Sequence, residues 1–355
     1  MSSYNLIGLM SGTSMDGLDI AFVKFKIDKN NDWSFDLANS YTTSYNKSLL
    51  EKLKNSKNLS AIELLQLDKE LGQFFSKAVN DFIEINKINR DNIDAIASHG
   101  HTIYHQPENG FTCQIGCGDT IAYQTGIKVI NDFRQKDVIA GGQGAPLVPI
   151  GDKLLFKNQA EAFLNIGGFS NICYPNNNTK AYDICPGNLP LNYFAEKLGH
   201  SYDPNGQLSE SGSIEISILE KLNSIEFYNT LGPKSLGTEW LDNEFMPLFD
   251  KITNYNDALR TIVEHIAIQI SHDLIRNNVN SVYITGGGAK NKFLIERLNK
   301  LFNGEIITPT SDIIDYKESI IFAFLGALYL NDQPNCLSSV TGADKNVIGG
   351  VLHLP

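Results

Sequence analysis

The segment SGTSMDG at residues 11–17 places three hydroxyl groups, a carboxylate and two glycines between two apolar runs of the sequence. Glycine adopts positive φ at little cost, so the backbone of such a turn can approach a ligand closely. Backbone N–H groups and hydroxyls can bind phosphate, and the carboxylate of Asp16 suits a divalent metal. The segment predicts a phosphate-binding hairpin tip, with an ordinary tight turn of Gly and Ser as the alternative.

Polar residues also follow two short apolar segments that are typical of buried strands. Residues 93–98 are followed by His99, and residues 127–131 lead through Asp132 to Arg134. In open α/β sheets, ligands bind at the carboxyl ends of the strands. The pattern therefore predicts that His99 and Arg134 line a binding site.

The second half of the chain repeats the hairpin pattern of the first. The apolar runs 162–166 and 169–174 flank a Gly167-Gly168 turn, and Asp183 follows at a predicted strand-to-helix junction. A carboxylate at the end of a strand suits a general base, although Asp also caps turns and helices often.

A third glycine turn, residues 286–288, follows the predicted strand 281–285. The chain has no P-loop and no protein-kinase H-R-D motif, and the glycine turn does not fit the dinucleotide pattern. Two hairpin-led halves with glycine turns at their tips predict a duplicated α/β fold that clamps a nucleotide. The elements that position these turns are apolar-periodic helices, predicted over residues 48–86, 258–277, 291–302 and 317–330.

Length and composition limit the class of protein. The chain has 355 residues, 42% of them hydrophobic, so two domains are expected. The formal charge of −11 argues against nucleic-acid and anionic-membrane partners and favours a small molecule. Without a signal-like or membrane-spanning apolar run, we expect a cytoplasmic protein.

Metal-binding side chains occur in suggestive but unspecific patterns. The five cysteines form no repeated C-x-x-C pair, which favours reduced thiols over disulfides or structural zinc. His99, His101 and His105 raise zinc binding as an alternative, but their spacing on a strand and loop sets no coordination geometry.

Several long motifs together make the chain resemble the anhydro-N-acetylmuramic acid kinase family, within the superfamily of acetate and sugar kinases, heat-shock chaperones and actin. The resemblance covers nearly the whole chain and is carried by GLMSGTSMDGLD from Gly8, ASHGHTIYHQP from Ala97, NDFRQKDVIAGGQGAPLVP from Asn131, LNIGGFSN from Leu164, PGN from Pro186, GPKS from Gly232 and TGGGAKN from Thr285. It implies a two-lobed, actin-like α/β fold, a duplicated ribonuclease H-like fold with an interlobe active-site cleft. We expect residues 1–128 with about 340–355 in one lobe and 129–339 in the other.

The resemblance implies a reaction that uses ATP and Mg²⁺. Water opens the 1,6-anhydro bond of 1,6-anhydro-N-acetylmuramic acid while the γ-phosphoryl group passes to O6, giving N-acetylmuramic acid 6-phosphate and ADP in cell-wall recycling. It also suggests a homodimer.

The resemblance assigns roles to residues of this chain. Asp183 is the expected base, and Glu318, at the start of the last predicted helix, orients water or a sugar hydroxyl unless it only complements the helix N-terminus. The expected nucleotide-binding residues are Gly12, Thr13, Ser14, Met15, Asp16, Gly17, Leu18, Asp19, Gly167, Gly168, Gly286, Gly287 and Gly288, with Asp16 near the metal through water. The expected sugar-binding residues are His99, Arg134, Asp137, Gln143 and Gly144. Arg134 suits the lactyl carboxylate of the sugar, with a salt bridge to Asp137 as the alternative.

The sequence departs from the family pattern at the turn after Asp183. Ile184 and Cys185 stand where the family usually has Thr and Gly, which suggests a lost hydroxyl contact and an added side chain near a phosphate. His101 and Thr238 replace a more usual Gln and Arg. The open alternatives are a kinase for another 1,6-anhydro sugar, which would need Arg134 less, and an ATP-gated binding protein of the same superfamily.

Overall fold

The computed structural model describes residues 2–12, 15–232 and 234–355, and it divides the chain into two compact units. The first unit comprises Met1–Leu155 and Tyr316–Pro355, and the second comprises Phe156–Asp315. This division differs from the expected one, because residues 129–155 and 316–339 belong to the first unit. Val129–Asn131 forms a strand of the first sheet, and the helix after Tyr316 packs on that sheet.

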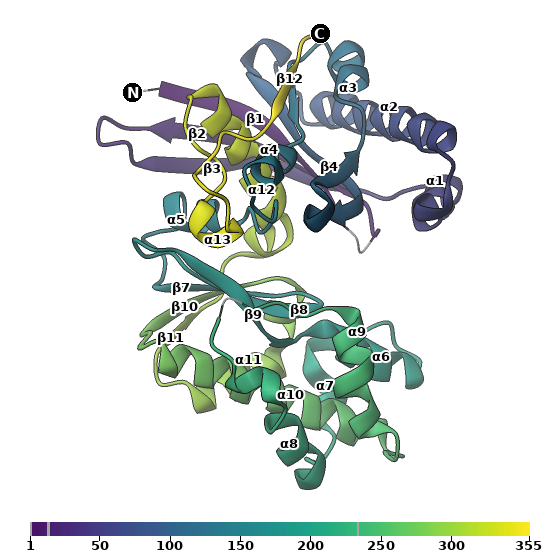
Figure 1. Ribbon diagram of the computed structural model, residues 1–355, viewed down its shortest axis with the longest axis vertical. Helices are drawn as coiled ribbons and strands as arrows, with labels where there is room; N and C mark the ends of the chain where they lie inside the picture. Colours follow the sequence, from purple (N-terminus) through teal and green to yellow (C-terminus); the bar gives the residue numbers. More distant parts are fainter. Residues whose placement is uncertain (1, 13–14, 233) are drawn as a thin grey trace. The chain divides into compact units, whose positions relative to one another are not determined.

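The described residues of the first unit form a seven-stranded mixed sheet with the order β12-β6-β4-β1-β2-β3, in which β5 also pairs with β4 (Figure 1). β1 pairs antiparallel with β2 and parallel with β4, and β6 continues the parallel side of the sheet. The strands are β1 (Ser2–Ser11), β2 (Leu18–Ile27), β3 (Trp33–Thr43), β4 (Ala95–Gln106), β5 (Phe111–Ile115), β6 (Val129–Asn131) and β12 (Val351–His353).

Helices cover both faces of this sheet, because β1 is apolar on both sides. Ile7 and Leu9 point into a core that includes Leu71 and Phe75 of α2. On the opposite face α12 packs so closely that a Cβ at Gly8 would overlap with the backbone of this helix. The helices are α1 (Lys47–Lys54), α2 (Ala61–Ile85), α3 (Gly118–Thr125), α4 (Gln135–Ile139), α5 (Pro149–Leu154), α12 (Ser311–Leu330) and α13 (Ser338–Thr341).

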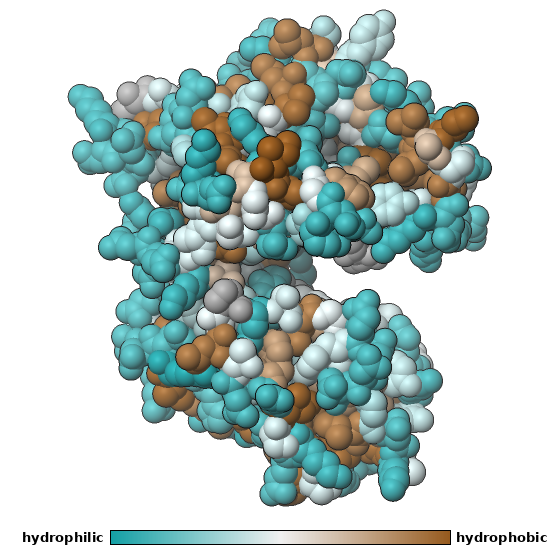
Figure 2. Space-filling model, viewed as in Figure 1, coloured by the Kyte–Doolittle hydropathy of each residue, from teal (hydrophilic) through white to brown (hydrophobic). Residues whose placement is uncertain are grey.

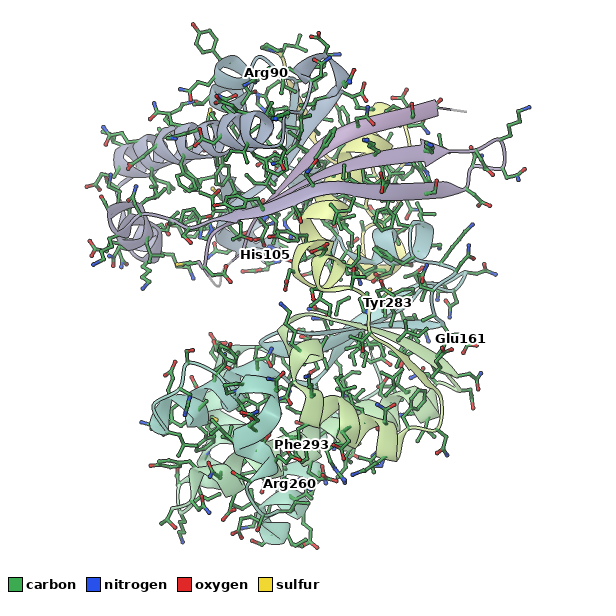
Figure 3. All side chains as sticks on the ribbon, turned by 180° about the vertical axis from the view of Figure 1, so that it is seen from behind. Arg90, His105, Glu161, Arg260, Tyr283 and Phe293 are labelled. Carbon is green, nitrogen blue, oxygen red and sulfur yellow. The ribbon has the colours of Figure 1, made fainter. Side chains whose placement is uncertain are left out.

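The second unit has a five-stranded sheet, over its described residues, with the order β11-β10-β7-β8-β9. Its strands are β7 (Ala162–Ile166), β8 (Phe169–Tyr174), β9 (Lys180–Pro186), β10 (Ser281–Thr285) and β11 (Glu305–Ile307). Its helices are α6 (Asn188–Lys197), α7 (Gln207–Glu210), α8 (Ile216–Asn223), α9 (Thr238–Trp240), α10 (Tyr255–Arg276) and α11 (Lys292–Leu301). α10 is central to the core, and Figure 3 shows its Arg260 beside Phe293 of α11, with the guanidinium carbon 4.5 Å from the ring centroid.

The two sheets repeat one topology, which confirms the predicted duplicated α/β fold. In each unit three antiparallel strands come first, and the next strand pairs parallel with the first of them. A further parallel strand then extends the sheet, β6 in the first unit and β11 in the second. On the face shown in Figure 2, hydrophobic residues are interspersed with hydrophilic ones over each unit.

Three predicted elements differ from those observed. The single helix expected over residues 48–86 is two, because α1 ends before a 3₁₀ turn (Ser56–Asn58) and α2 begins anew with a capping box at Ser60 and Glu63. β4 continues through His99 to Gln106 by pairing with β5, so His99 lies within a strand. α12 begins at Ser311, so Glu318 lies in its third turn. Its charge is therefore too far from the N-terminus of the helix to stabilise the helix dipole.

Candidate active site

The tip of the β1–β2 hairpin turns where the sequence predicts a phosphate-binding loop. The N–H of Met15 donates to the carbonyl of Gly12 at 3.2 Å, and Met15 has a φ of 57°. A Cβ at Gly17 would lie 2.7 Å from the carbonyl oxygen of Thr43, so this position requires glycine. Thr13 and Ser14, two of the expected phosphate-binding residues, lie outside the described residues. The Leu18 side chain is fully buried, so only its backbone can face a ligand.

Three buried side chains form a hydrogen-bonded series at the end of β1, where the hairpin tip begins. No local sequence pattern indicates this series. The Ser11 hydroxyl lies 2.7 Å from the Tyr45 hydroxyl and 2.8 Å from Nδ1 of His101. Burial raises the pKa of Tyr45 to about 12 and lowers that of His101. Both side chains are therefore neutral near pH 7, and they fix the end of β1 without adding charge.

His99 holds the guanidinium of Arg134 in one orientation. Nε of Arg134 donates to Nε2 of His99 at 3.1 Å, and Nη2 of Arg134 lies 3.0 Å from the same His99 atom. Nη1 of Arg134 donates to the Gly144 carbonyl at 2.7 Å. Burial and the adjacent guanidinium hold the pKa of His99 well below its usual range, so the imidazole is a neutral acceptor. These contacts leave one N–H on each of Nη1 and Nη2 without a hydrogen bond to the described residues.

Asp137 fixes the loop that carries Gly144, rather than pairing with Arg134. Its carboxylate is fully buried and accepts from the N–H of Gly144 and from the Thr341 hydroxyl, each at 2.8 Å. Gly144 has a φ of +68°, and the side chain of Gln143 is exposed beside it. Asp137, expected to bind the sugar, is thus enclosed by protein and instead orients the loop whose Gly144 carbonyl holds Arg134.

Glu318 belongs to a group of carboxylates in the first unit. Its side chain is exposed, yet desolvation by the surrounding protein atoms raises its pKa, with Arg134 opposing and the charges of Asp19 and Asp16 adding to the effect. Asp19 accepts from the Thr42 hydroxyl at 2.6 Å, and Asp16 is exposed at the hairpin tip. Because these like charges act on one another, a cation in their vicinity would be favoured.

In the second unit, Asp183 is a half-buried carboxylate within β9, not at the strand end. Its Oδ2 accepts from the N–H of Leu236 at 2.8 Å, and its own N–H donates to the carbonyl of Lys234 at 2.9 Å. Burial raises the pKa of this carboxyl, and the Leu236 hydrogen bond opposes the effect. The group thus has one oxygen anchored and a greater affinity for a proton than an ordinary Asp.

A β-bulge beside Asp183 explains why the next two side chains both face the core. Ser170 pairs with Cys185 and Asn171 pairs with Asp183, which leaves Ile184 without a partner in the ladder. Ile184 and Cys185 consequently both lie in the core, 3% and 0% exposed, while Asp183 points away from it. Bulges re-aim side chains in this way. The expectation that Cys185 lies where a phosphate approaches is therefore corrected, because its thiol is enclosed.

The glycine turns of the second unit meet at one edge of its sheet. The N–H groups of Gly187 and Asn188 donate to the carbonyls of Gly168 and Gly167, each at 2.8 Å. Gly286 has a φ of +81°, and a Cβ there would lie 2.6 Å from the carbonyl oxygen of Ile166.

The next two glycines differ in their surroundings. A Cβ at Gly288 would overlap with the Ile166 side chain, whereas Gly287 is exposed and has room for one. Packing thus accounts for Gly286 and Gly288, and it leaves Gly287 open to a ligand.

The described residues contain no group of three or more His, Cys, Asp or Glu side chains able to hold a metal ion directly. Each of the three histidines considered for zinc has another partner, since His99 binds Arg134, His101 binds Ser11, and Nδ1 of His105 lies 3.3 Å from the Thr112 hydroxyl. Within the described part of the chain, no helix is long and apolar enough to cross a membrane.

Comparison with known proteins decides the family. The family model for anhydro-N-acetylmuramic acid kinase matches residues 4–355. The chain belongs to the anhydro-N-acetylmuramic acid kinase family. Relatives from Shewanella pealeana and Sulfurovum sp., each named anhydro-N-acetylmuramic acid kinase, are 37% and 36% identical, and the matches cover 99% of both chains in each case. Membership of this family identifies the chain as a sugar kinase.

Solved structures give weaker matches. An activator of 2-hydroxyisocaproyl-CoA dehydratase from Clostridium difficile is 14% identical, with a TM-score of 0.45 over 92% of this chain and 97% of that one. A ROK family glucokinase from Streptomyces griseus is 8% identical, with a TM-score of 0.39 over 90% and 98%.

Proposed function

We propose that this member of the anhydro-N-acetylmuramic acid kinase family hydrolyses the 1,6-anhydro bond of 1,6-anhydro-N-acetylmuramic acid and phosphorylates O6 with ATP. The oxygen of water bonds to C1 as the C1–O6 bond breaks. O6 then bonds to the γ-phosphorus, and the bridging oxygen leaves with ADP. The water proton passes to a base, so the products are N-acetylmuramic acid 6-phosphate, ADP and one proton.

The observation that carries this proposal is the setting of Asp183. The carboxylate points away from the core, the Leu236 N–H fixes one oxygen, and the other is left to accept a proton. Burial raises its pKa, which strengthens it as a base at the pH where it stays ionised. A base of this kind contributes about 10²- to 10⁴-fold to the rate.

Arg134 is the proposed partner of the lactyl carboxylate of the sugar. Its contacts with His99 and Gly144 hold the guanidinium plane and leave one N–H on each Nη atom. A carboxylate accepts such a pair of N–H groups through its two oxygens. His99, Asp137 and Gly144 act by positioning this group, and Gln143 is exposed beside it.

We assign the phosphates of ATP to the hairpin from Gly12 to Asp19 and to the Gly167-Gly168 turn, and the adenosine to the glycine turn at residues 286–288. The carboxylates of Asp16, Asp19 and Glu318 fit a Mg²⁺ ion held mainly through water, since their charges act on one another. Bound there, Mg²⁺ would neutralise charge on the phosphates. Glu318 is also assigned to orient the attacking water or a sugar hydroxyl.

The test is ADP release by the purified chain with ATP and Mg²⁺, with and without the anhydro sugar, and with the product analysed by mass spectrometry. We expect sugar-dependent ADP and a product heavier by one phosphoryl group and one water. ADP release indifferent to the sugar would instead support an ATP-gated binding protein. Activity confined to an anhydro sugar without a lactyl group would identify a kinase for a different sugar.

We also assign the protein to the cytoplasm, where ATP is available. The five cysteines are all free, as expected for a reducing compartment. The homodimer suggested by the resemblance stays a prediction, which the molar mass in solution tests.

A further inference from the structure

A polar pocket of about 340 Å³ opens on the second unit, and the proposed reaction makes no use of it. It is lined by residues at the end of α8, in the 3₁₀ turn Glu226–Asn229 and on α10, namely Asn223, Tyr228, Asn229, Gln269, His272 and Arg276. Its volume is at the lower end of the range for small-molecule sites.

The pocket lies on the helix-covered side of the sheet and not on the side of Asp183. Side chains alternate along β9, and Tyr182 turns toward α10, where its hydroxyl lies 3.0 Å from Asp273. Asp183, the next residue, therefore faces the opposite side. A ligand in the pocket is separated from the proposed base by the strand itself.

A buried histidine determines which polar groups at the pocket wall remain free to donate hydrogen bonds. His265 is fully buried, and burial lowers its pKa to about 3, so it is neutral and carries one N–H. The Asn223 oxygen, 2.7 Å from Nδ1, must accept that proton, so Nε2 accepts from the Tyr228 hydroxyl at 2.9 Å. Gln269 donates to the same Asn223 oxygen at 2.9 Å. The oxygen of Asn223 is thereby occupied, and its NH₂ group is left as a donor without a partner among the described residues.

The charged side chains at the pocket, like the free Asn223 amide, favour a ligand that accepts hydrogen bonds and carries negative charge. Arg276 and His272 are exposed at its rim, and Arg276 makes no hydrogen bond or ion pair with the described residues. The acidic neighbour on α10, Asp273, is buried and bonded to the hydroxyls of Tyr174 and Tyr182. Its carboxylate is therefore turned away from the pocket, which leaves donors and positive charge to meet a ligand.

We propose that this pocket binds the oxyanion of a small organic molecule, either a carboxylate or a phosphate ester, through the Arg276 guanidinium and the Asn223 amide. The Gln269 and Asn229 side chains offer further polar contacts to the remainder of the ligand, and His272 adds a donor at the rim. This inference does not depend on the proposed kinase reaction.

The test is a titration of the full chain with inorganic phosphate and, separately, with acetate, followed by NMR of the Asn223 and Gln269 side-chain amides. These local signals distinguish the pocket from any phosphate bound elsewhere. We expect saturable shifts, and the tighter of the two anions identifies the ligand class. Arg276→Gln should weaken binding about tenfold or more, because it removes a charged hydrogen bond.

Lys221→Gln is the matched control, since Lys221 is an exposed cation on α8 outside the pocket lining. It removes the same charge and should leave the affinity unchanged. Both variants alter exposed side chains, so they should fold as the parent does. Absence of saturable shifts, or equal weakening by the two variants, would overturn the proposal.

Discussion

At the scale of single residues, the raised pKa of Asp183 has a consequence for the pH dependence of the reaction. The base must be ionised, and burial shifts its ionisation above the usual value of about 3.9 for Asp. We therefore expect the acid limb of kcat/KM to fall at a higher pH than an ordinary Asp would give. A pH profile checks this, and a limb at or below the ordinary value would contradict it.

Arg134 supports a second prediction, which separates the possible sugars. Arg134→Gln removes the paired N–H groups, so KM for the lactyl-bearing anhydro sugar should rise about tenfold or more. An anhydro sugar without the lactyl group should lose little, because it has no carboxylate to bind. Steady-state kinetics with both sugars measure the difference. Equal losses with the two sugars would remove Arg134 from carboxylate recognition.

At the scale of elements, the bulge in β9 changes what the unusual turn residues are expected to do. Ile184 and Cys185 are enclosed in the core of the second unit. The double variant Ile184→Thr, Cys185→Gly should therefore lower the free energy of unfolding by about 2–4 kcal/mol, through lost burial and an enclosed hydroxyl. Its kcat and KM should stay near those of the parent.

Denaturant unfolding and steady-state kinetics at a temperature where both proteins are folded check this pair of outcomes. A gain in kcat with unchanged stability would show that the two residues act on the reaction instead.

The glycine turn after β10 allows stability and ligand binding to be separated. Gly288→Ala forces a Cβ onto Ile166 and should cost about 1–3 kcal/mol of stability. Gly287→Ala is the matched control for folding, because Gly287 is exposed and the atom nearest to its added Cβ, the Asn188 amide nitrogen, lies at 3.4 Å. We expect this variant to fold normally and to raise KM for ATP. An unchanged KM would argue against nucleotide contact at this turn.

At the scale of the whole molecule, the sequence predicted the repeated hairpins and the duplication, because their apolar runs and glycine turns are local signals. It missed β3, an edge strand in which the alternation of apolar and polar residues over 33–37 does not continue to Thr43. It also misplaced the division between the units, because α12 belongs with the first sheet only through packing that is distant in sequence, such as Gly8 against Ser319.

The candidate site was predictable to a similar degree. Glycine turns, Arg134 and Asp183 were found from motifs, whereas the Tyr45–Ser11–His101 chain and the bulge at Ile184 depend on contacts and register that no local pattern encodes. The buried role of Asp137 was likewise hidden, because its partner Thr341 is far away in the sequence.

The central claim, that Asp183 is the base, is tested most directly by comparing the Asp183→Asn variant with the parent. The amide keeps an oxygen for the Leu236 N–H. It also removes a partly buried carboxylate that lowers the stability of the folded state when it is ionised, as its raised pKa indicates. The variant should be at least as stable as the parent at pH 7. We predict a fall in sugar-dependent kcat of about 10²- to 10⁴-fold with little change in ATP binding. A folded variant that retains the kcat of the parent would contradict the account.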